Sequence, residues 1–323
     1  MRADLHLHSY YSGQAGHLRF LRARDSYSDP MDVYRAAKAR GMDLVTITDH
    51  DTIDGCLAFL DRRPDAADFF VSEEIECRLP GADLRFHLGA YGITERIHRE
   101  IQPLRANVVE AAAYLRAEQV FFALNHPFFY FRHQLPLGEY LEMARRLFPA
   151  VEVRNGTMLR VHNQLAERMV RRWQAEGGGP GAIGGSDAHT LRGIGTTWTE
   201  APGASPADFL RSLAGGLGRP GGVHGGVWRE AREIYGVVGR YWKALLGFGP
   251  DDLSPGRRAF GLAFSAVSLP FEFFPVLIAA RHKRVEAEAV ARCRREWEAE
   301  AVPAGDRHAR LAAPGRAATG QAP

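Results

Sequence analysis

Histidine, aspartate and glutamate recur in short strings along the first 190 residues of this 323-residue chain, which hold ten of its 13 histidines. His6 and His8 open the series at a spacing of i, i+2. On a strand this spacing places both imidazoles on one face, with Cα atoms roughly 7 Å apart. The later strings are Asp49-His50-Asp51, Glu73-Glu74, His87, His126-Pro127, Glu152 and Ser186-Asp187-Ala188-His189. Nitrogen and oxygen donors of this kind are the ligands of water-activating metal ions.

Each string lies on or just after a segment that reads as a β-strand. Residues 42–48, for example, form an almost continuous apolar and β-branched run that ends at Asp49, which is typical of a strand buried on both faces. The other predicted strands are residues 3–7, 69–75, 85–93, 120–125, 150–154 and 182–185. Because the carboxyl ends of parallel barrel strands meet at one mouth, the sequence predicts a single polynuclear metal site there.

Each string also has a simpler interpretation when taken alone. His6 and His8 could be ordinary buried or surface histidines, and His87 could be a core histidine bonded to backbone. Asp49 could be a turn or cap residue. The recurrence at strand after strand favours the metal site over these alternatives.

Helical patterns separate the predicted strands. Asp29-Pro30 is a helix start, with a capping side chain before a first-turn proline, and Gly41 is the matching stop. Further helices are predicted over residues 102–118, 139–147, 162–176 and 209–214. About seven strands with interleaved helices favour a distorted (β/α)7, TIM-like barrel with a C-terminal helical extension.

The composition changes at residues 215–226, where seven of twelve residues are glycine, so a linker or domain edge is predicted there. The predicted domains are residues 1–218 as a metal-dependent hydrolase barrel and 219–301 as a helical extension. Helices are expected over 227–246 and 285–301. Residues 302–323, rich in Ala, Gly and Pro, are expected to be a disordered tail.

Charge and cysteine content narrow the function classes. The net charge is +3, with 16 basic and 11 acidic residues in 219–323. The balance of the N-terminal part gives no support to a nucleic-acid-binding surface, and the tail-ward excess favours an anionic membrane surface. The three cysteines form no CxxC pair, so no disulfide partner is expected. A cytoplasmic location, with membrane association as an option, follows from this and from the lack of an apolar signal-peptide core at the start.

Taken together in order, the motifs resemble the PHP (polymerase and histidinol phosphatase) domain family. They are His6-Leu7-His8-Ser9, the string from Ile47 to Gly55, His87-Leu88-Gly89, His126-Pro127 and Gly185-Ser186-Asp187-Ala188-His189. The resemblance covers roughly residues 1–200. It implies a distorted seven-stranded barrel with two or three divalent ions (Mn²⁺, Zn²⁺ or Fe²⁺), in a family whose members mostly hydrolyse phosphate esters.

The resemblance also implies a role for each matching residue. His6, His8 and Asp187 would hold a first ion, and Glu74, with Glu73 as a close competitor, would bridge it to a second. His87 and His126 would complete the second site, and His50 and His189 would bind a third ion. Glu152 stands where the family has an acidic residue after the strand, and whether it is a ligand stays open.

One position departs from the family pattern. Many family phosphatases have an aspartate for the third ion after the second serine, but Gly13 follows Ser12 here, and an insert of residues 15–28 comes next. The third ion is therefore in doubt. His17 in the insert could take the missing place, although an ordinary insert residue is the simpler interpretation.

The first functional hypothesis is a metal-dependent phosphoesterase that uses a metal-bridging hydroxide on a small phosphorylated metabolite. Arg154 and Arg192 are candidates for gripping the phosphate, because a guanidinium binds it with two hydrogen bonds. The alternatives are a metal-dependent amidohydrolase and a membrane-associated, non-catalytic PHP-like protein.

Residues 259–280 are largely apolar but contain Glu272, Pro270 and Pro275, and basic pairs or clusters flank them. They make a poor membrane span. We expect residues 257–284 to dock on the barrel, on a second copy of the chain or on a membrane surface, and to be dispensable for metal binding.

Overall fold

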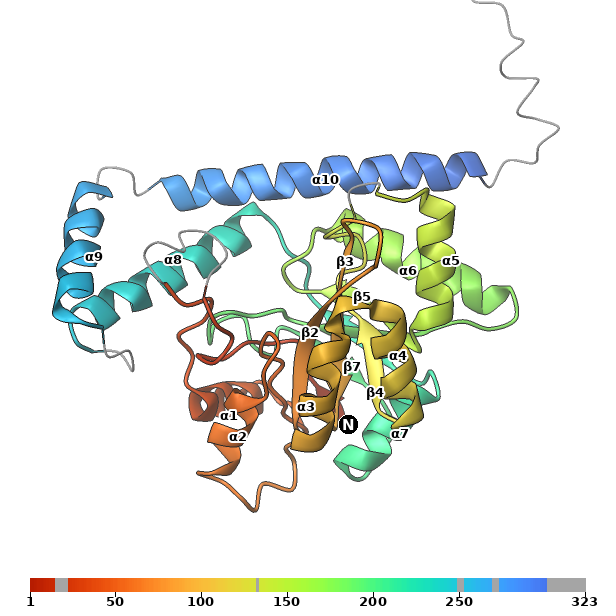
Figure 1. Cartoon of the computed structure of the whole chain (residues 1–323), viewed down its shortest axis with the longest axis horizontal. Coiled ribbons are helices and arrows are strands. Elements are labelled where there is room, and N and C mark those ends of the chain that lie inside the picture. Colours follow the sequence, from red (N-terminus) through yellow and green to blue (C-terminus); the bar gives the residue numbers. More distant parts are fainter. Residues whose placement is uncertain (15–22, 132–133, 249–252, 269–272, 301–323) are drawn as a thin grey trace, which may run out of the picture.

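A five-stranded mixed sheet forms the centre of the computed structural model (Figure 1), which describes residues 1–14, 23–131, 134–248, 253–268 and 273–300. The strand order is β2-β3-β4-β5-β6. β2 pairs antiparallel with β3 and β3 with β4, whereas β4–β5 and β5–β6 are parallel. Their bounds are β2 Ser72–Arg78, β3 Arg85–Tyr91, β4 Phe121–Leu124, β5 Ala150–Asn155 and β6 Gly181–Gly185.

A second sheet of order β1-β7-β8 lies beside the first. It consists of β1 Arg2–Ala3, β7 Thr197–Glu200 and β8 Arg219–Gly222, all antiparallel. Residues 3–7 and 42–48 were expected as strands. Apart from Ala3, which belongs to β1, they make isolated parallel bridges such as Leu7–Ala188 and Val45–Phe69. The mixed α/β class is as predicted, but the described residues form no closed barrel and do not reproduce seven regular βα units.

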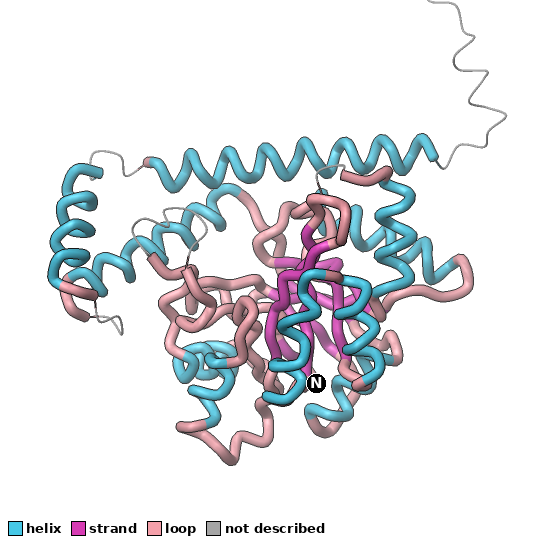
Figure 2. The backbone as a smooth tube through the Cα atoms, viewed as in Figure 1, coloured by secondary structure: helices cyan, strands magenta, loops and turns pink. Residues whose placement is uncertain are grey.

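Helices lie around the sheets (Figure 2). Their bounds are α1 Pro30–Ala39, α2 Asp54–Leu60, α3 Glu95–Ile101, a 3-10 turn Gln102–Ala106, α4 Val108–Ala117, α5 Leu137–Leu147, α6 Arg160–Ala175 and α7 Pro206–Ala214. Asp29 caps α1 as expected, accepting a hydrogen bond from the Met31 amide. The predicted helix over 102–118 is divided, because Asn107 is extended and caps α4. The largest core cluster lies between β2–β5 and helices α3–α6.

The glycine-rich stretch that was expected as a linker contains β8. Arg219–Gly222 pairs along its whole length with β7. Gly222 has φ +100° and its Cα approaches the backbone of Thr196 so closely that a Cβ would lie 2.3 Å from a carbonyl oxygen. The predicted boundary between residues 218 and 219 therefore falls inside a sheet, because the glycines allow close strand packing here rather than a free linker.

Three C-terminal helices complete the described chain: α8 Val227–Leu245, α9 Pro255–Ser268 and α10 Phe274–Glu300. α10 runs across one side of the molecule, against α8, α6 and α5 (Figure 1), and buries Ala279, Val290 and Cys293. The apolar segment 259–280 is thus divided between α9 and the start of α10, with residues 269–272 outside the described part. Among the described helices, none is long and apolar enough to span a bilayer. The predicted tail 302–323 lies outside the described residues.

Candidate metal centre

Glu74 on β2 lies at the middle of the candidate site and is fully buried. Its carboxylate faces five imidazoles. Oε1 is 3.1 Å from His6 Nε2, 3.2 Å from His87 Nδ1 and 3.2 Å from His126 Nε2, and Oε2 is 3.0 Å from His50 Nδ1 and 3.7 Å from His8 Nε2. Glu73 points to the opposite face of the strand, as alternation requires, and pairs with His98 at 2.8 Å. Of the two glutamates, Glu74 is therefore the one that faces the histidines.

His6 and His8 point to the same side of the extended segment, as their spacing predicts. Asp187 Oδ1 lies 3.5 Å from Nε2 of each ring. Gly185 makes this approach possible, because a Cβ there would lie 2.4 Å from the Cβ of His6. The last predicted string therefore meets the first, although about 180 residues separate them.

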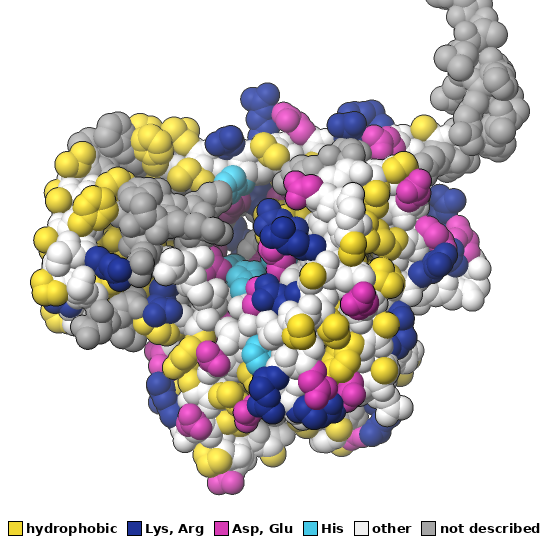
Figure 3. All heavy atoms as spheres, in the orientation of Figure 1, with side chains coloured by type: hydrophobic (Ala, Val, Ile, Leu, Met, Phe, Trp, Pro, Cys, Tyr) yellow, Lys and Arg dark blue, Asp and Glu magenta, His cyan; other side chains and the backbone are white. Residues whose placement is uncertain are grey.

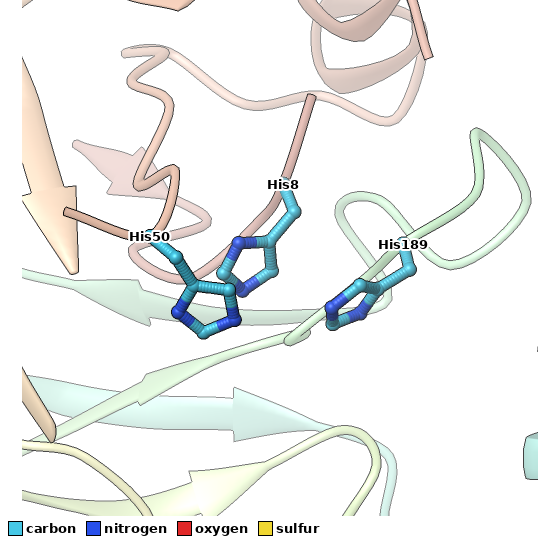
Figure 4. Close-up of side chains that lie close together, drawn as sticks. All are labelled: His8, His50 and His189. Atoms are coloured by element: carbon cyan, nitrogen blue, oxygen red, sulfur yellow. The ribbon is translucent and has the colours of Figure 1, made fainter. Parts of the chain in front are cut away.

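His50 and His189 lie on either side of His8 (Figure 4). The ring centroid of His8 is 4.5 Å from that of His50 and 4.4 Å from that of His189, and both pairs are stacked. Asp25, from the end of the insert, lies beside them: its Oδ2 is 2.8 Å from His189 Nε2 and 3.6 Å from His50 Nε2. No strand pattern or motif precedes Asp25, so sequence reasoning missed it.

His87 and His126 complete the group on the other side of Glu74. The second ring nitrogen of His87, Nε2, faces Glu76 Oε2 at 3.6 Å, a neighbour that the sequence did not single out. His126 and Asp187 both have left-handed backbone, with φ +26° and +53°. Such conformations are unfavourable for residues other than glycine and cluster at functional sites.

The donor set fits divalent metal ions. Among the described residues, His6 Nε2, His8 Nε2, Glu74 Oε2 and both ring nitrogens of His87 are buried without a hydrogen-bond partner. Donor atoms that share an ion at about 2.1 Å lie roughly 3–3.5 Å apart, and the distances around Glu74 are close to this range. Four overlapping groups can each converge on one ion: His6-His8-Asp187, His6-Glu74-His126, His50-Glu74-His87 and His8-His50-His189.

The charges of the group point the same way. Burial opposes ionisation of Glu74 and Asp187, but the surrounding histidines outweigh it and hold the pKa of both carboxyls well below their usual range. Burial, with His189 and His50 nearby, lowers the pKa of His8 to about 3, so this ring is neutral. Burial disfavours the protonated form of His87 as well, but Glu74 raises its pKa to about 9. Cations bound among these carboxylates would take the place of the histidine protons.

A second layer of polar groups orients the first. Glu152 Oε1 accepts from His6 Nδ1 at 3.0 Å, and its Oε2 accepts from the amide of His126. It thus lies behind His6, on the side away from Glu74. Asn155 Nδ2 and the hydroxyl of Thr157 lie 3.2 and 2.9 Å from Oδ2 of Asp187.

The helical extension reaches this layer. Buried Lys283 on α10 donates to the carbonyl of Thr157 at 2.7 Å and pairs with Glu286 and Glu230. This contact joins α10 to the segment that orients Asp187. That residues 257–284 are dispensable for metal binding stays a prediction, and Lys283 is the residue at which to test it.

The two candidate arginines lie apart from the histidines. Arg154 Nη1 donates to the carbonyl of Gly222 at 3.1 Å, since an irregularity in β5 follows Glu152 and turns the side chain toward β8. Arg192 is exposed. In the described part of the chain, no hydrogen bond or ion pair joins either guanidinium to the eight candidate ligands. His17 lies outside the described residues.

The site opens to solvent on one side. Histidine side chains lie at the margin of a hollow between the C-terminal helices and the rest of the molecule (Figure 3). His50 and His189 are the exposed members, with 31% and 24% of their side chains accessible. A buried set of imidazoles and carboxylates with one accessible side defines the class: an α/β protein with a candidate polynuclear metal centre.

Comparison with known proteins supports a resemblance to one family. A family model described as "PHP-associated" matches residues 161–216, which confirms the resemblance to the PHP family that the motifs indicate. An uncharacterized protein from Methanocaldococcus jannaschii is 46% identical over 55 residues, or 17% of this chain and 32% of that protein. The chain thus matches about a third of the length of this curated relative.

The solved structures that are similar to much of the chain include the following two. PsfC from Pseudomonas syringae has a TM-score of 0.49 and 16% identity, covering 75% of this chain and 98% of that one. The lesion-specific endonuclease PfuEndoQ from Pyrococcus furiosus has a TM-score of 0.46 and 14% identity, covering 90% of each chain.

Proposed function

We propose that this chain is a metal-dependent hydrolase and that its substrate is a small phosphate ester. The observation that carries the proposal is the convergence of buried donor atoms without hydrogen-bond partners around Glu74. The metal ligands would be His6, His8, His50, Glu74, His87, His126, Asp187 and His189. When bound, two or more divalent ions lower the pKa of a coordinated water and withdraw charge from phosphoryl oxygens.

The chain's own residues would prepare the site for this chemistry. Glu152 holds the His6 ring with Nε2 toward the other donors, and Asn155 and Thr157 fix the rotamer of Asp187. His8 is neutral, and in the tautomer that donates from Nδ1 to the Ser12 hydroxyl at 2.9 Å its Nε2 lone pair is available to an ion. Rigid placement of this kind lowers the cost of assembling the reacting groups.

We also propose that the two sheets and their bridges are a distorted form of the predicted barrel, in which bridges replace regular ladders at residues 4–8 and 44–50. The catalytic unit would then be residues 1–218 extended by β8. The helical extension would cover one side of it, as the packing of α10 on α5 and α6 supports.

A substrate screen tests the proposed function. The full chain is freed of metal, reloaded with Mn²⁺ or Zn²⁺, and assayed against phosphomonoesters, phosphodiesters and amides. We expect phosphate-ester hydrolysis that a chelator abolishes and added metal restores. Asp187→Asn should lose it, whereas Asp61→Asn, an exposed position outside the site, should retain it.

The second candidate is amide hydrolysis, because the same activated water can attack a carbonyl carbon. Arg154 and Arg192 lie away from the histidines, so neither would grip a phosphate at the metal centre. This observation favours amide hydrolysis as the second candidate, because phosphate recognition would depend on the ions alone. Turnover of amides but not of phosphate esters would select this alternative. A fully metal-loaded protein that turns over neither phosphate esters nor amides would contradict the proposed hydrolase activity and favour the non-catalytic alternative.

A further inference from the structure

The end of the insert brings a carboxylate to the accessible side of the site. The amide of Asp25 donates to the carbonyl of Gly13 at 3.1 Å, and Gln14 and Arg24 form an antiparallel bridge. The chain thus leaves at residue 14 and returns at residue 24, so that Asp25 lies next to Gly13. Gly13 has φ +89°, a left-handed conformation that glycine adopts without strain.

Asp25 faces two imidazoles with one oxygen. Oδ2 is 2.8 Å from Nε2 of His189 and 3.6 Å from Nε2 of His50. The two rings come from distant strand ends and lie on opposite sides of His8 (Figure 4), whose own Nε2 is buried without a hydrogen-bond partner among the described residues. His50 contacts Glu74 through Nδ1, so that its other ring nitrogen, Nε2, is the one that faces Asp25.

We propose that Asp25 is the carboxylate ligand of a third divalent ion, which it holds together with His50 and His189. This inference rests on the proposed metal-dependent function. Two imidazoles and one carboxylate leave open coordination positions, as in metal sites that bind a substrate or water. The three side chains are also the accessible ones, with 23–31% of each exposed, so an ion here can meet an anionic substrate that enters from solvent.

Metal counting in the full chain tests the assignment. Wild type, Asp25→Asn and the control Asp32→Asn, an exposed surface position in α1, are reloaded with Mn²⁺, dialysed and analysed for bound metal. We expect three ions in wild type and the control, and two in Asp25→Asn. A titration should show that the weakest site of Asp25→Asn has lost affinity by at least about 10-fold.

Three results would overturn the inference. They are equal metal content in wild type and Asp25→Asn, only two ions in wild type, or loss of all ions in a folded Asp25→Asn variant. The second result would leave the proposed hydrolase with two ions, whereas a wild type that binds none would remove the proposed function itself. If Asp25→Asn unfolds at a lower temperature than wild type, the Asp25→Glu variant is tested instead. It retains the negative charge and should keep the third ion. Loss of the third ion in Asp25→Glu would contradict the ligand role.

Discussion

Glu152 Oε1 accepts a 3.0 Å hydrogen bond from Nδ1 of His6, while Nε2 of the same ring faces Glu74 and Asp187. The carboxylate therefore fixes which nitrogen is free to bind an ion and makes it more basic, as carboxylates behind metal-bound histidines do. The sequence left open whether Glu152 binds an ion itself. From its position we expect it to orient His6 instead.

Replacing Glu152 by Gln should weaken metal binding without removing the fold. Loss of the charge should lower the affinity for Mn²⁺ or Zn²⁺ by about 10–100-fold, measured by competition with a chelator of known affinity. Glu167→Gln, which alters a surface pair with Arg171 on α6, is the matched control. Unchanged affinity in Glu152→Gln would show that the His6 ring needs no carboxylate behind it.

Removal of the Thr157 hydroxyl should have a related effect on Asp187. The hydroxyl lies 2.9 Å from Asp187 Oδ2, so Thr157→Val leaves that carboxylate with one fewer orienting group. We expect a loss of metal affinity in the same 10–100-fold range, with Thr157→Ser close to wild type because it retains the hydroxyl.

Lys283→Met tests whether α10 contributes through the Thr157 carbonyl. Wild-type affinity in this variant would agree with the expectation that residues 257–284 are dispensable for metal binding, whereas weaker binding would contradict it.

Docking of α10 should depend on pH through Glu286. Burial opposes its ionisation, but His162 and Lys283 outweigh this and lower its pKa to about 2 from 4.5. The folded state thus binds this proton less readily than the unfolded state. The ionised Glu286 therefore adds up to about 3 kcal/mol to the free energy of unfolding. This contribution is fully present above pH 4.5 and is lost as pH falls toward 2.

Urea unfolding of wild type and Glu286→Gln at several pH values measures this contribution. The free energy of unfolding should differ between the two at pH 6, and the difference should shrink steadily between pH 4.5 and 2.5. A difference that does not vary with pH would mean that the effect of the substitution is not the charge of Glu286.

The apolar side chains around α9 predict binding to anionic bilayers. Phe260, Val267, Phe273 and Leu277 are 54%, 74%, 53% and 53% exposed, and hydrophobic side chains gather on this end of the molecule (Figure 3). Three basic side chains near them are also exposed: Arg257 on α9, and Arg281 and Arg284 on α10. Apolar area next to basic charge is the combination that binds anionic lipid surfaces.

Sedimentation with vesicles checks this. More protein should sediment with phosphatidylglycerol vesicles than with phosphatidylcholine vesicles, and Phe260→Ser with Val267→Ser should reduce the difference. Equal sedimentation with both lipids, or with neither, would argue against a membrane role. A concentration-dependent dimer would then account for the exposed face.

Most residues of the candidate site could be singled out from the sequence, because they fall in short strings of histidine and carboxylate residues on or just after segments that read as strands. Period-2 spacing correctly placed His6 with His8. The preference for Glu74 over Glu73 came from the family resemblance, and the sequence kept Glu73 as a close competitor. The fold was less accessible. Residues 42–48 read as a buried strand yet form isolated bridges, because pairing depends on neighbours that local pattern does not reveal.

Three other features depend on tertiary contacts. β8 looked like a linker because its glycines carry no apolar pattern, and the irregularity after Glu152 turned Arg154 away from the predicted side. Asp25 is a lone aspartate among arginines in an insert. Only the pairing of Gln14 with Arg24 brings it to His189, and no local signal encodes that return.

The metal content of the full chain tests the central claim most directly. Wild type, reloaded with Mn²⁺ and dialysed, should contain at least two ions per chain by elemental analysis. Glu74→Gln should lose both bound metal and turnover, because Glu74 faces five of the histidine ligands. Glu73→Gln, the adjacent glutamate on the opposite face of β2, should retain both. A reloaded wild type without stoichiometric metal, or a Glu74→Gln variant that binds metal as wild type does, would contradict the account.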